Sequence, residues 1–125
     1  LALDLYVPQF GGWAFTKSAA GRFVDTNCRD YGFIVRYPSY GEKQTGIPYE
    51  PWHLRYVGLP HPQIIMDEYL TLEEYIDLLK PGSFYQYGSY LISHQNGRVI
   101  DAPSGWKHVT VSEDNLGGYL FTWEL

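Results

Sequence analysis

Glu50 and His53 stand three residues apart in the segment Tyr49–Gly58, which is rich in aromatic side chains. A neutral imidazole nitrogen is a common zinc ligand, and a carboxylate that does not bind the metal can take a proton from water. The Glu-x-x-His spacing therefore fits a zinc hydrolase. The same residue types also fit a surface glutamate beside a half-buried histidine in an aromatic cluster, so the spacing alone leaves both interpretations open.

The backbone around this pair is not helical. Pro48 and Pro51 bracket Glu50, and a proline in a helix interior removes a hydrogen bond and clashes with the preceding turn. This excludes the helical arrangement in which two zinc-binding histidines stand one turn apart. We expect a loop that runs into a strand at Leu54–Val57, so that backbone geometry holds Glu50 and His53.

A second candidate metal ligand, Asp4, lies far away in the sequence. Residues 1–7 alternate between leucines and other side chains, which predicts a strand with one face packed on a core. Asp4 projects from the opposite face, beside the methyl group of Ala2. A short carboxylate in such a place is a good zinc ligand when an imidazole is near. Otherwise it is a hydrogen-bonded or exposed strand residue.

The elements that must position these residues include a helix and a strand between them. Apolar residues recur at helical spacing over Thr16–Tyr31, and Gly32 stands where a glycine cap ends a helix. Cys28 lies in this apolar pattern, so we expect a buried structural thiol. Phe33–Tyr37 is then a short strand that stops at Pro38.

Two shorter helices are expected after the Glu-x-x-His segment. Gln63–Glu68 forms the first of them. Thr71 and Glu74 match a capping box, which predicts the start of a second helix that ends near Lys80–Gly82. The segment Ser39–Pro48, rich in glycine and polar residues, is expected to be a loop.

The chain from residue 83 onward is prone to form strands. Phe84–Ser93 is aromatic, Asn96-Gly97 is a strong hairpin-turn signal, and Val99-Ile100 continues the return strand. Lys107–Val111 and Tyr119–Trp123 predict two further strands. His94 and His108 fall in this region and are expected to be ordinary strand or turn residues. The elements together predict an α+β fold, with helices on a small antiparallel sheet and a β appendage.

Composition excludes several classes of function. The net charge is −5 and no basic stripe occurs, which argues against nucleic acid as the main partner. A single cysteine, Cys28, excludes an internal disulfide framework and a cysteine metal cluster. No apolar run is long enough to span a membrane.

The segment Tyr49–Gly58 resembles the "EPWHxRYVG" signature of VanY-type D-alanyl-D-alanine carboxypeptidases. These belong to the LAS-type zinc metallopeptidases, which include D-Ala-D-Ala dipeptidases and L,D-carboxypeptidases. Ala2-Leu3-Asp4 matches the end of the family's first motif, Ser-x-His-x-x-Gly-x-Ala-x-Asp. Arg29–Pro38 is similar to the segment between the two motifs, and Leu70–Tyr75 resembles the helix that follows. The resemblance covers about residues 1–80.

The resemblance implies a role for each matching residue. Asp4 and His53 would be zinc ligands. Glu50 would be the general base that deprotonates the zinc-bound water and later protonates the leaving amine, in agreement with the chemistry of its residue type. We predict that Trp52 lines the substrate pocket and that Arg55 pairs with a substrate carboxylate. The alternative for Arg55 is a structural salt bridge.

The match to the family lacks one metal ligand. The family's third ligand is the histidine seven residues before the motif's aspartate, and that position would lie four residues before Leu1. We therefore expect an N-terminally truncated chain that carries two of three ligands, which would hold zinc weakly. His61 is the nearest substitute, although the family places a histidine near here outside the metal's coordination.

The resemblance predicts a zinc-dependent D,D-carboxypeptidase that removes the terminal D-Ala from peptidoglycan stem peptides. Residues 1–82 would form the C-terminal part of its catalytic domain and residues 83–125 the small all-β appendage. An L,D-carboxypeptidase or a D-Ala-D-Ala dipeptidase is the enzymatic alternative. A non-catalytic peptidoglycan-binding or structural domain with an incomplete metal site is the alternative of another class. The expected location is extracellular or the cell envelope, through an N-terminal membrane anchor; the oligomeric state is left open.

Overall fold

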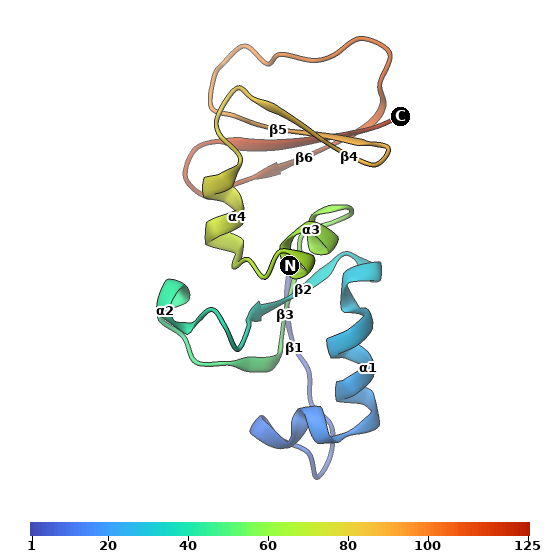
Figure 1. The fold of residues 1–125 in the computed structure, drawn as a ribbon, viewed down its shortest axis with the longest axis vertical. Helices are drawn as coiled ribbons and strands as arrows, with labels where there is room; N and C mark the ends of the chain where they lie inside the picture. The colour runs from blue at the N-terminus through green and yellow to red at the C-terminus, as the bar shows by residue number, and fades with distance from the viewer. The chain divides into compact units, whose positions relative to one another are not determined.

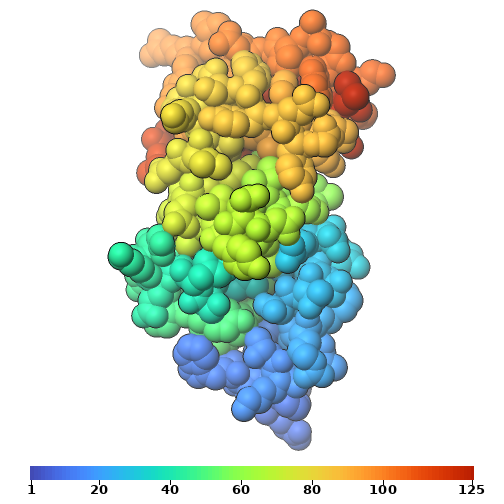
Figure 2. Space-filling model, viewed as in Figure 1, coloured from blue at the N-terminus to red at the C-terminus, as the bar shows by residue number.

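A computed structural model describes every residue from Leu1 to Leu125, and the chain forms two compact units (Figure 1). Unit 1 is Leu1–Tyr75, blue to yellow-green in Figure 2, and unit 2 is Ile76–Leu125, yellow to red. Each unit contains one antiparallel sheet, and most of the helices belong to unit 1. The expected α+β fold class is confirmed, whereas the division into a catalytic part (1–82) and an appendage (83–125) stays a prediction.

The sheet of unit 1 has β3 at its centre. Its strands are β1 (Ala2–Asp4), β2 (Phe33–Tyr37) and β3 (Glu50–Tyr56), in the order β1-β3-β2, and both pairings are antiparallel. The first residues of the chain and the segment before Pro38 therefore flank the Glu-x-x-His segment on its two sides.

The first strand is shorter than expected and does not have the buried face that its alternating pattern predicted. All three residues of β1 are exposed, and Leu1 and Leu3 are 74% and 38% exposed. Only Leu5, beyond the strand, packs against the buried cluster of unit 1. The alternating pattern correctly predicted a strand, but the prediction that one face of it is buried was wrong. The reason is that β1 is an edge strand and the core lies nearer the centre of the sheet.

The helix expected over Thr16–Tyr31 is three consecutive elements: η1 (Gly12–Lys17), α1 (Ala19–Asn27) and η2 (Cys28–Tyr31). Ser18 interrupts the helical backbone with an extended conformation, and its Oγ accepts the Gly21 N–H at 2.9 Å as an N-cap. Gly32 ends η2 at φ +85°, which confirms the predicted glycine cap.

The core of unit 1 forms where these helices meet the sheet. Cys28, Val35 and Leu54 are its buried centre, and η1 and α1 contact β3. Burial raises the pKa of the Cys28 thiol to about 11, so the thiol stays protonated and inert. The expectation of a buried structural cysteine is confirmed.

The remaining helices of the chain are short. They are α2 (Glu42–Thr45) within the expected loop, α3 (His61–Asp67), and α4 (Leu72–Leu78), which runs from unit 1 into unit 2. The capping box at the start of α4 is confirmed: the Thr71 N–H donates to Glu74 Oε2 at 2.8 Å, and the Glu74 N–H donates to Thr71 Oγ1 at 3.2 Å. None of the helices has the length and apolar character that crossing a membrane requires.

Unit 2 is built on a four-stranded antiparallel sheet. Its strands are β4 (Phe84–Tyr87), β5 (Tyr90–Gln95), β6 (Lys107–Glu113) and β7 (Tyr119–Glu124), in the order β4-β5-β7-β6. The strands expected at Lys107–Val111 and Tyr119–Trp123 are confirmed, each slightly longer than predicted.

The first hairpin of unit 2 is not where the sequence predicted it. Phe84–Ser93 is not one strand: it turns at Gly88-Ser89, where Tyr87 pairs with Tyr90 and Gly88 has a φ of +56°. Val99-Ile100 forms no strand. The Gln95 side chain instead bonds both backbone groups of Asp101, at 2.9 Å each, and this occupies the segment that would have returned along β5.

Candidate active site

The pairing of β1 with β3 brings the distant candidate ligands together. Asp4 and His53 are direct partners in the register of the two strands. Asp4 Oδ1 lies 3.0 Å from His53 Nδ1, and Glu50 Oε2 lies 3.4 Å from the same nitrogen. Both carboxylates therefore meet the imidazole at Nδ1.

An irregularity in the β2–β3 pairing accounts for the position of Glu50. Residues three apart in a regular strand face opposite sides of the sheet. Here Val35 pairs with Leu54 and Tyr37 pairs with Glu50, so two residue steps on β2 face four on β3. The additional residues bulge out of the ladder and re-aim the side chains, which allows Glu50 and His53 to approach one point.

Pro51 lies within this bulge and is fully buried. A proline cannot donate to a strand ladder and is found in sheets at edges and bulges. The strand expected to begin at Leu54 therefore begins at Glu50 and carries the whole Glu-x-x-His segment. The predicted start was wrong, because the bulge admits a proline that a regular strand interior would exclude.

The three side chains differ in exposure. His53 and Glu50 are 24% and 29% exposed, whereas Asp4 is 72% exposed. The ring of Tyr37 packs edge-on against the His53 ring, with centroids 5.0 Å apart and planes at 61°. The imidazole is thus fixed between an aromatic ring and two carboxylates, at a position that solvent and a ligand can reach.

The donor set can be tested against zinc. A carboxylate oxygen and an imidazole nitrogen are ligand types that zinc accepts, and bonds of about 2.0–2.1 Å at tetrahedral angles separate two ligand atoms by about 3.3 Å. The 3.0 Å between Asp4 Oδ1 and His53 Nδ1 is close to that value. The chain contains no cluster of three or more His, Cys, Asp or Glu side chains that could together bind a metal ion. The residues present thus fit zinc as two ligands of a larger set.

His61 does not lie with these residues. It is 3% exposed, and its Nδ1 is 2.7 Å from the hydroxyl of Tyr75. Burial lowers the pKa of His61 to about 4, so its imidazole is neutral near pH 7. The contact with Tyr75 gives His61 a packing role between α3 and α4.

The two predicted substrate-binding residues lie on the same strand as His53. Arg55 is half-buried and pairs with Ala2 and Ile34 in the strand register. It takes part in no salt bridge, and its buried Nε has no hydrogen-bond partner. A structural salt bridge for Arg55 is therefore absent. Trp52 is half-buried, and its backbone carbonyl accepts the Leu5 N–H at 2.9 Å.

Sequence reasoning did not single out Tyr37 or Trp13. Tyr37 contacts His53 as described, and the Trp13 ring lies 6.2 Å from the ring of Tyr49, the neighbour of Glu50. The sequence predicted a strand that ends at Tyr37, but the contact of its ring with His53 depends on the pairing of β2 with β3. Trp13 is 66% exposed and had no signal in the sequence, because its place depends on the fold of η1 against β3.

The histidines of unit 2 have the ordinary roles expected of them. His94 Nδ1 lies 3.1 Å from the Leu79 carbonyl oxygen, and its Nε2 lies 2.7 Å from Asp114 Oδ2. Both ring nitrogens are thereby used inside unit 2. His108 stands at a bulge of β6 with a φ of +48°.

A cavity of about 260 Å³ also occurs in unit 1, and it is separate from the Glu50–His53 pair. Tyr40, Tyr49 and Tyr69 line it together with Asp25 and Arg29. Neither Asp4, Glu50 nor His53 lines this cavity, whereas Tyr49 and Pro38, the chain neighbours of Glu50 and Tyr37, do.

Comparison with known proteins identifies the relatives of this chain. The model of the D-alanyl-D-alanine carboxypeptidase family VanY matches residues 1–59. A D-alanyl-D-alanine carboxypeptidase of Enterococcus faecium is 36% identical over 115 residues, which are 85% of this chain and 37% of that protein. The chain thus spans a little over a third of the length of this curated relative.

Solved structures of D,D-peptidases are also similar to this chain. The vancomycin-resistance D,D-dipeptidase VanXYg, in complex with a D-Ala-D-Ala phosphinate analogue, aligns with a TM-score of 0.81 and 27% identity over 100% of this chain and 56% of its own. A D,D-pentapeptidase VanY from a VanB-type resistance cassette, in complex with Zn(II), aligns with a TM-score of 0.51 and 37% identity. That alignment covers 61% of this chain and 41% of the VanY chain.

Proposed function

We propose that this chain, of which residues 1–59 match the model of the VanY family of D-alanyl-D-alanine carboxypeptidases, contributes to a zinc-dependent D,D-carboxypeptidase. Its substrate would be a peptidoglycan stem peptide, from which it removes the terminal D-Ala. The observation that carries the proposal is the meeting of Asp4 and Glu50 at Nδ1 of His53. Hydrolysis of a peptide bond at a zinc site uses three protein ligands and an adjacent free carboxylate, and these residues would supply two of the ligands and the carboxylate.

Each of the three residues has one role in this proposal. Asp4 and His53 hold zinc, which when bound supplies a Lewis acid that polarises the scissile carbonyl and acidifies water. Glu50 accepts the proton of the attacking water and delivers it to the leaving amine. Its half-buried position beside Nδ1 of His53 supports this role, because a shuttling carboxylate has to lie within hydrogen-bond reach of the reacting atoms.

Arg55 and Trp52 are proposed to bind the substrate. The C-terminal carboxylate of a stem peptide needs a cationic partner, and a guanidinium can pair with it through two parallel hydrogen bonds. The absence of a salt bridge and the unpartnered Nε of Arg55 support this assignment. Trp52, on the same strand, would supply an apolar wall of the substrate pocket.

Three other functions are alternatives to this proposal. Alignment of the whole chain with a D,D-dipeptidase favours hydrolysis of free D-Ala-D-Ala, and an L,D-carboxypeptidase would share the same chemistry. A non-catalytic peptidoglycan-binding or structural domain is the alternative of another class. Peptidoglycan lies outside the cytoplasmic membrane, so in each case we propose a role in the cell envelope or outside the cell.

The experiment compares the chain with its Glu50→Gln variant in the presence of Zn(II). A D-Ala-D-Ala-terminated pentapeptide, free D-Ala-D-Ala and a tetrapeptide with an L,D bond distinguish the three enzymatic alternatives. We expect release of D-Ala from the pentapeptide and a loss of at least 100-fold for Glu50→Gln, the usual contribution of a general base or acid. Zinc affinity, measured by calorimetry, should be unchanged.

Glu42→Gln, at an exposed position of α2, is the matched control and should keep full activity. Binding of peptidoglycan fragments without release of any product would favour the non-catalytic domain. Equal rates for Glu50→Gln and the unchanged chain would contradict the role of Glu50.

A further inference from the structure

The imidazole of His53 has to be held in one orientation for Nδ1 to face both carboxylates. Nδ1 lies 3.0 Å from Asp4 Oδ1 and 3.4 Å from Glu50 Oε2. Half a turn about the Cβ–Cγ bond would replace this nitrogen by a ring carbon. Since His53 is 24% exposed, the ring needs a packing partner to stay in place, as metal-binding histidines generally do.

Tyr37 is the aromatic residue that packs against this ring. The Tyr37 and His53 centroids are 5.0 Å apart with planes at 61°, which is an edge-to-face contact. Tyr37 also stands opposite Glu50 in the strand register, next to the irregularity that re-aims the site. It therefore lies beside both the imidazole and the carboxylate of the Glu-x-x-His pair.

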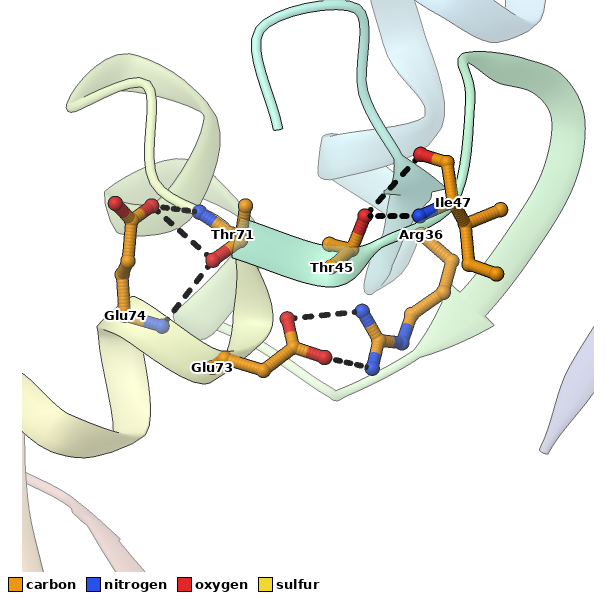
Figure 3. Close-up of polar contacts among 6 residues, drawn as sticks. All are labelled: Arg36, Thr45, Ile47, Thr71, Glu73 and Glu74. Atoms are coloured by element: carbon orange, nitrogen blue, oxygen red, sulfur yellow. Dashed lines mark hydrogen bonds and ion pairs between the residues drawn. The ribbon is translucent and has the colours of Figure 1, made fainter. Parts of the chain in front are cut away.

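Tyr37 is itself held by Arg36. The guanidinium carbon of Arg36 lies 5.0 Å from the centroid of the Tyr37 ring, a cation–π arrangement. Both terminal nitrogens of Arg36 donate to the carboxylate of Glu73 at the start of α4, with Nη1 3.1 Å from Oε2 (Figure 3). A two-pronged pair of this kind fixes the plane of the guanidinium.

The charge on Glu73 is secure near neutral pH. Burial opposes its ionisation, but the hydrogen bond from Arg36 and a backbone hydrogen bond together hold the pKa of Glu73 below its usual range. The capping box that joins Thr71 and Glu74 orders the same turn (Figure 3). A line of contacts thus runs from the start of α4 through Arg36 and Tyr37 to His53.

We propose that Tyr37 is a positioning residue whose ring keeps Nδ1 of His53 directed at Asp4 and Glu50. The aromatic ring performs this role, and the hydroxyl group is dispensable. The inference rests on the proposed function only for the use of that orientation, because the orientation itself can be measured without metal or substrate.

The first test is nuclear magnetic resonance of the metal-free chain at one fixed pH. Long-range proton–nitrogen spectra of His53 report which ring nitrogen carries the proton. We expect Nδ1 to carry it in the unchanged chain and in Tyr37→Phe, because two carboxylates face that nitrogen. In Tyr37→Leu, the ring loses its partner and we expect the mixed tautomers of a free histidine.

The second test is the affinity for Zn(II), measured by calorimetry on the same proteins. Loss of an edge-to-face contact corresponds to about a threefold to tenfold change in an equilibrium constant. We expect the dissociation constant of Tyr37→Leu to rise by this factor and that of Tyr37→Phe to stay within twofold. Tyr31→Leu, at a 65% exposed position, is the matched control and should change neither measurement.

The possible results separate this inference from the proposed function. Unchanged tautomers in Tyr37→Leu would overturn it, and so would a Tyr37→Phe variant as impaired as Tyr37→Leu. A chain that does not bind zinc would count against the proposed function, whereas the tautomer comparison would still decide the role of Tyr37. Should Tyr37→Leu fail to fold, Arg36→Lys loosens the Tyr37 ring without removing it and should shift the tautomers partially.

Discussion

At the scale of single residues, the chemistry depends on which atoms share one point. Asp4, Glu50 and His53 are ordinary residue types, and their meeting at Nδ1 of His53 is what makes them a candidate zinc site. His61 has the same imidazole but a different environment. It is buried against the hydroxyl of Tyr75, and that environment governs its protonation.

His61 should make the stability of the chain depend on pH. Its pKa falls from 6.5 in the unfolded chain to about 4 in the folded one, so between these values the unfolded state binds more protons. The free energy of unfolding is therefore highest above pH 6.5 and decreases as the pH falls toward 4. At about 1.4 kcal/mol per pH unit, the loss is on the order of 3 kcal/mol.

Urea unfolding between pH 7.5 and pH 4.5 measures this effect. His61→Gln retains a hydrogen-bonding side chain near Tyr75 but does not titrate, so its stability should depend less on pH. Parallel curves for the two proteins would show that other groups cause the loss. Tyr75→Phe, which leaves His61 in place, should retain most of the pH dependence.

At the scale of helices and strands, the ends of the elements determine where the site residues lie. Gly32 ends η2 and turns the chain into β2, and the Thr71–Glu74 capping box starts α4, where Glu73 holds Arg36. Both features are local, but each fixes a strand or side chain that contacts the candidate site. Substitution at either end should therefore reduce stability before it affects chemistry.

Gly32→Ala should destabilise the chain more than Gly46→Ala. Both glycines have a positive φ, +85° and +73°, which costs an L-residue about 1 kcal/mol. A Cβ at Gly32 would also lie 2.5 Å from a ring carbon of Tyr56, whereas nothing lies within 4 Å at Gly46. We expect losses of about 2–3 and about 1 kcal/mol, measured by urea unfolding. Equal losses would mean that the Tyr56 ring moves aside freely.

Thr71→Ala should cost about 1 kcal/mol, the usual value of an N-cap side chain. The substitution removes the Oγ1 that accepts the Glu74 N–H at 3.2 Å. Thr26→Ala, at an exposed position inside α1, is the matched control, and there alanine is the better helix former. Thermal unfolding followed by circular dichroism compares the two, and a stability loss of the same size in both would contradict a capping role for Thr71.

At the scale of the whole molecule, the chain consists of two compact units. Unit 1 contains all the candidate site residues, and unit 2 buries, among others, the side chain of His94. There, Asp114 accepts the backbone N–H groups of Leu116 and Gly118 through Oδ1 and contacts His94 through Oδ2. An aspartate bonded in this way ties the β6–β7 turn to β5.

Acid should loosen unit 2 through Asp114. The hydrogen bond from the Leu116 N–H, together with those from His94 and Gly118, keeps the pKa of Asp114 below its usual range. A depressed carboxyl pKa contributes stability that is present above the unfolded value of 3.8 and is lost as the pH falls through the folded value.

Residue-resolved hydrogen exchange of Asp114→Asn at neutral pH measures this contribution. We expect faster exchange in β5, β6 and β7, and unchanged exchange in β2 and β3 of unit 1. Accelerated exchange throughout the chain would instead indicate that the two units unfold together.

The sequence by itself determined the features that depend on neighbours along the chain. The glycine cap at Gly32, the capping box at Thr71 and the strand before Pro38 were all predictable, because each needs only a few consecutive residues. The residue types at Asp4, Glu50 and His53 likewise indicated zinc chemistry, although their roles are still proposals.

The tertiary structure decided which of these residues meet. Asp4 reaches His53 only because β1 and β3 pair in one register, and Glu50 joins them only because the β2–β3 ladder is irregular. The same holds for the ring of Tyr37 on His53, which no local pattern predicts. Strand register and bulges depend on contacts between distant segments, so they follow from the packing of the whole unit and not from the residues of one strand.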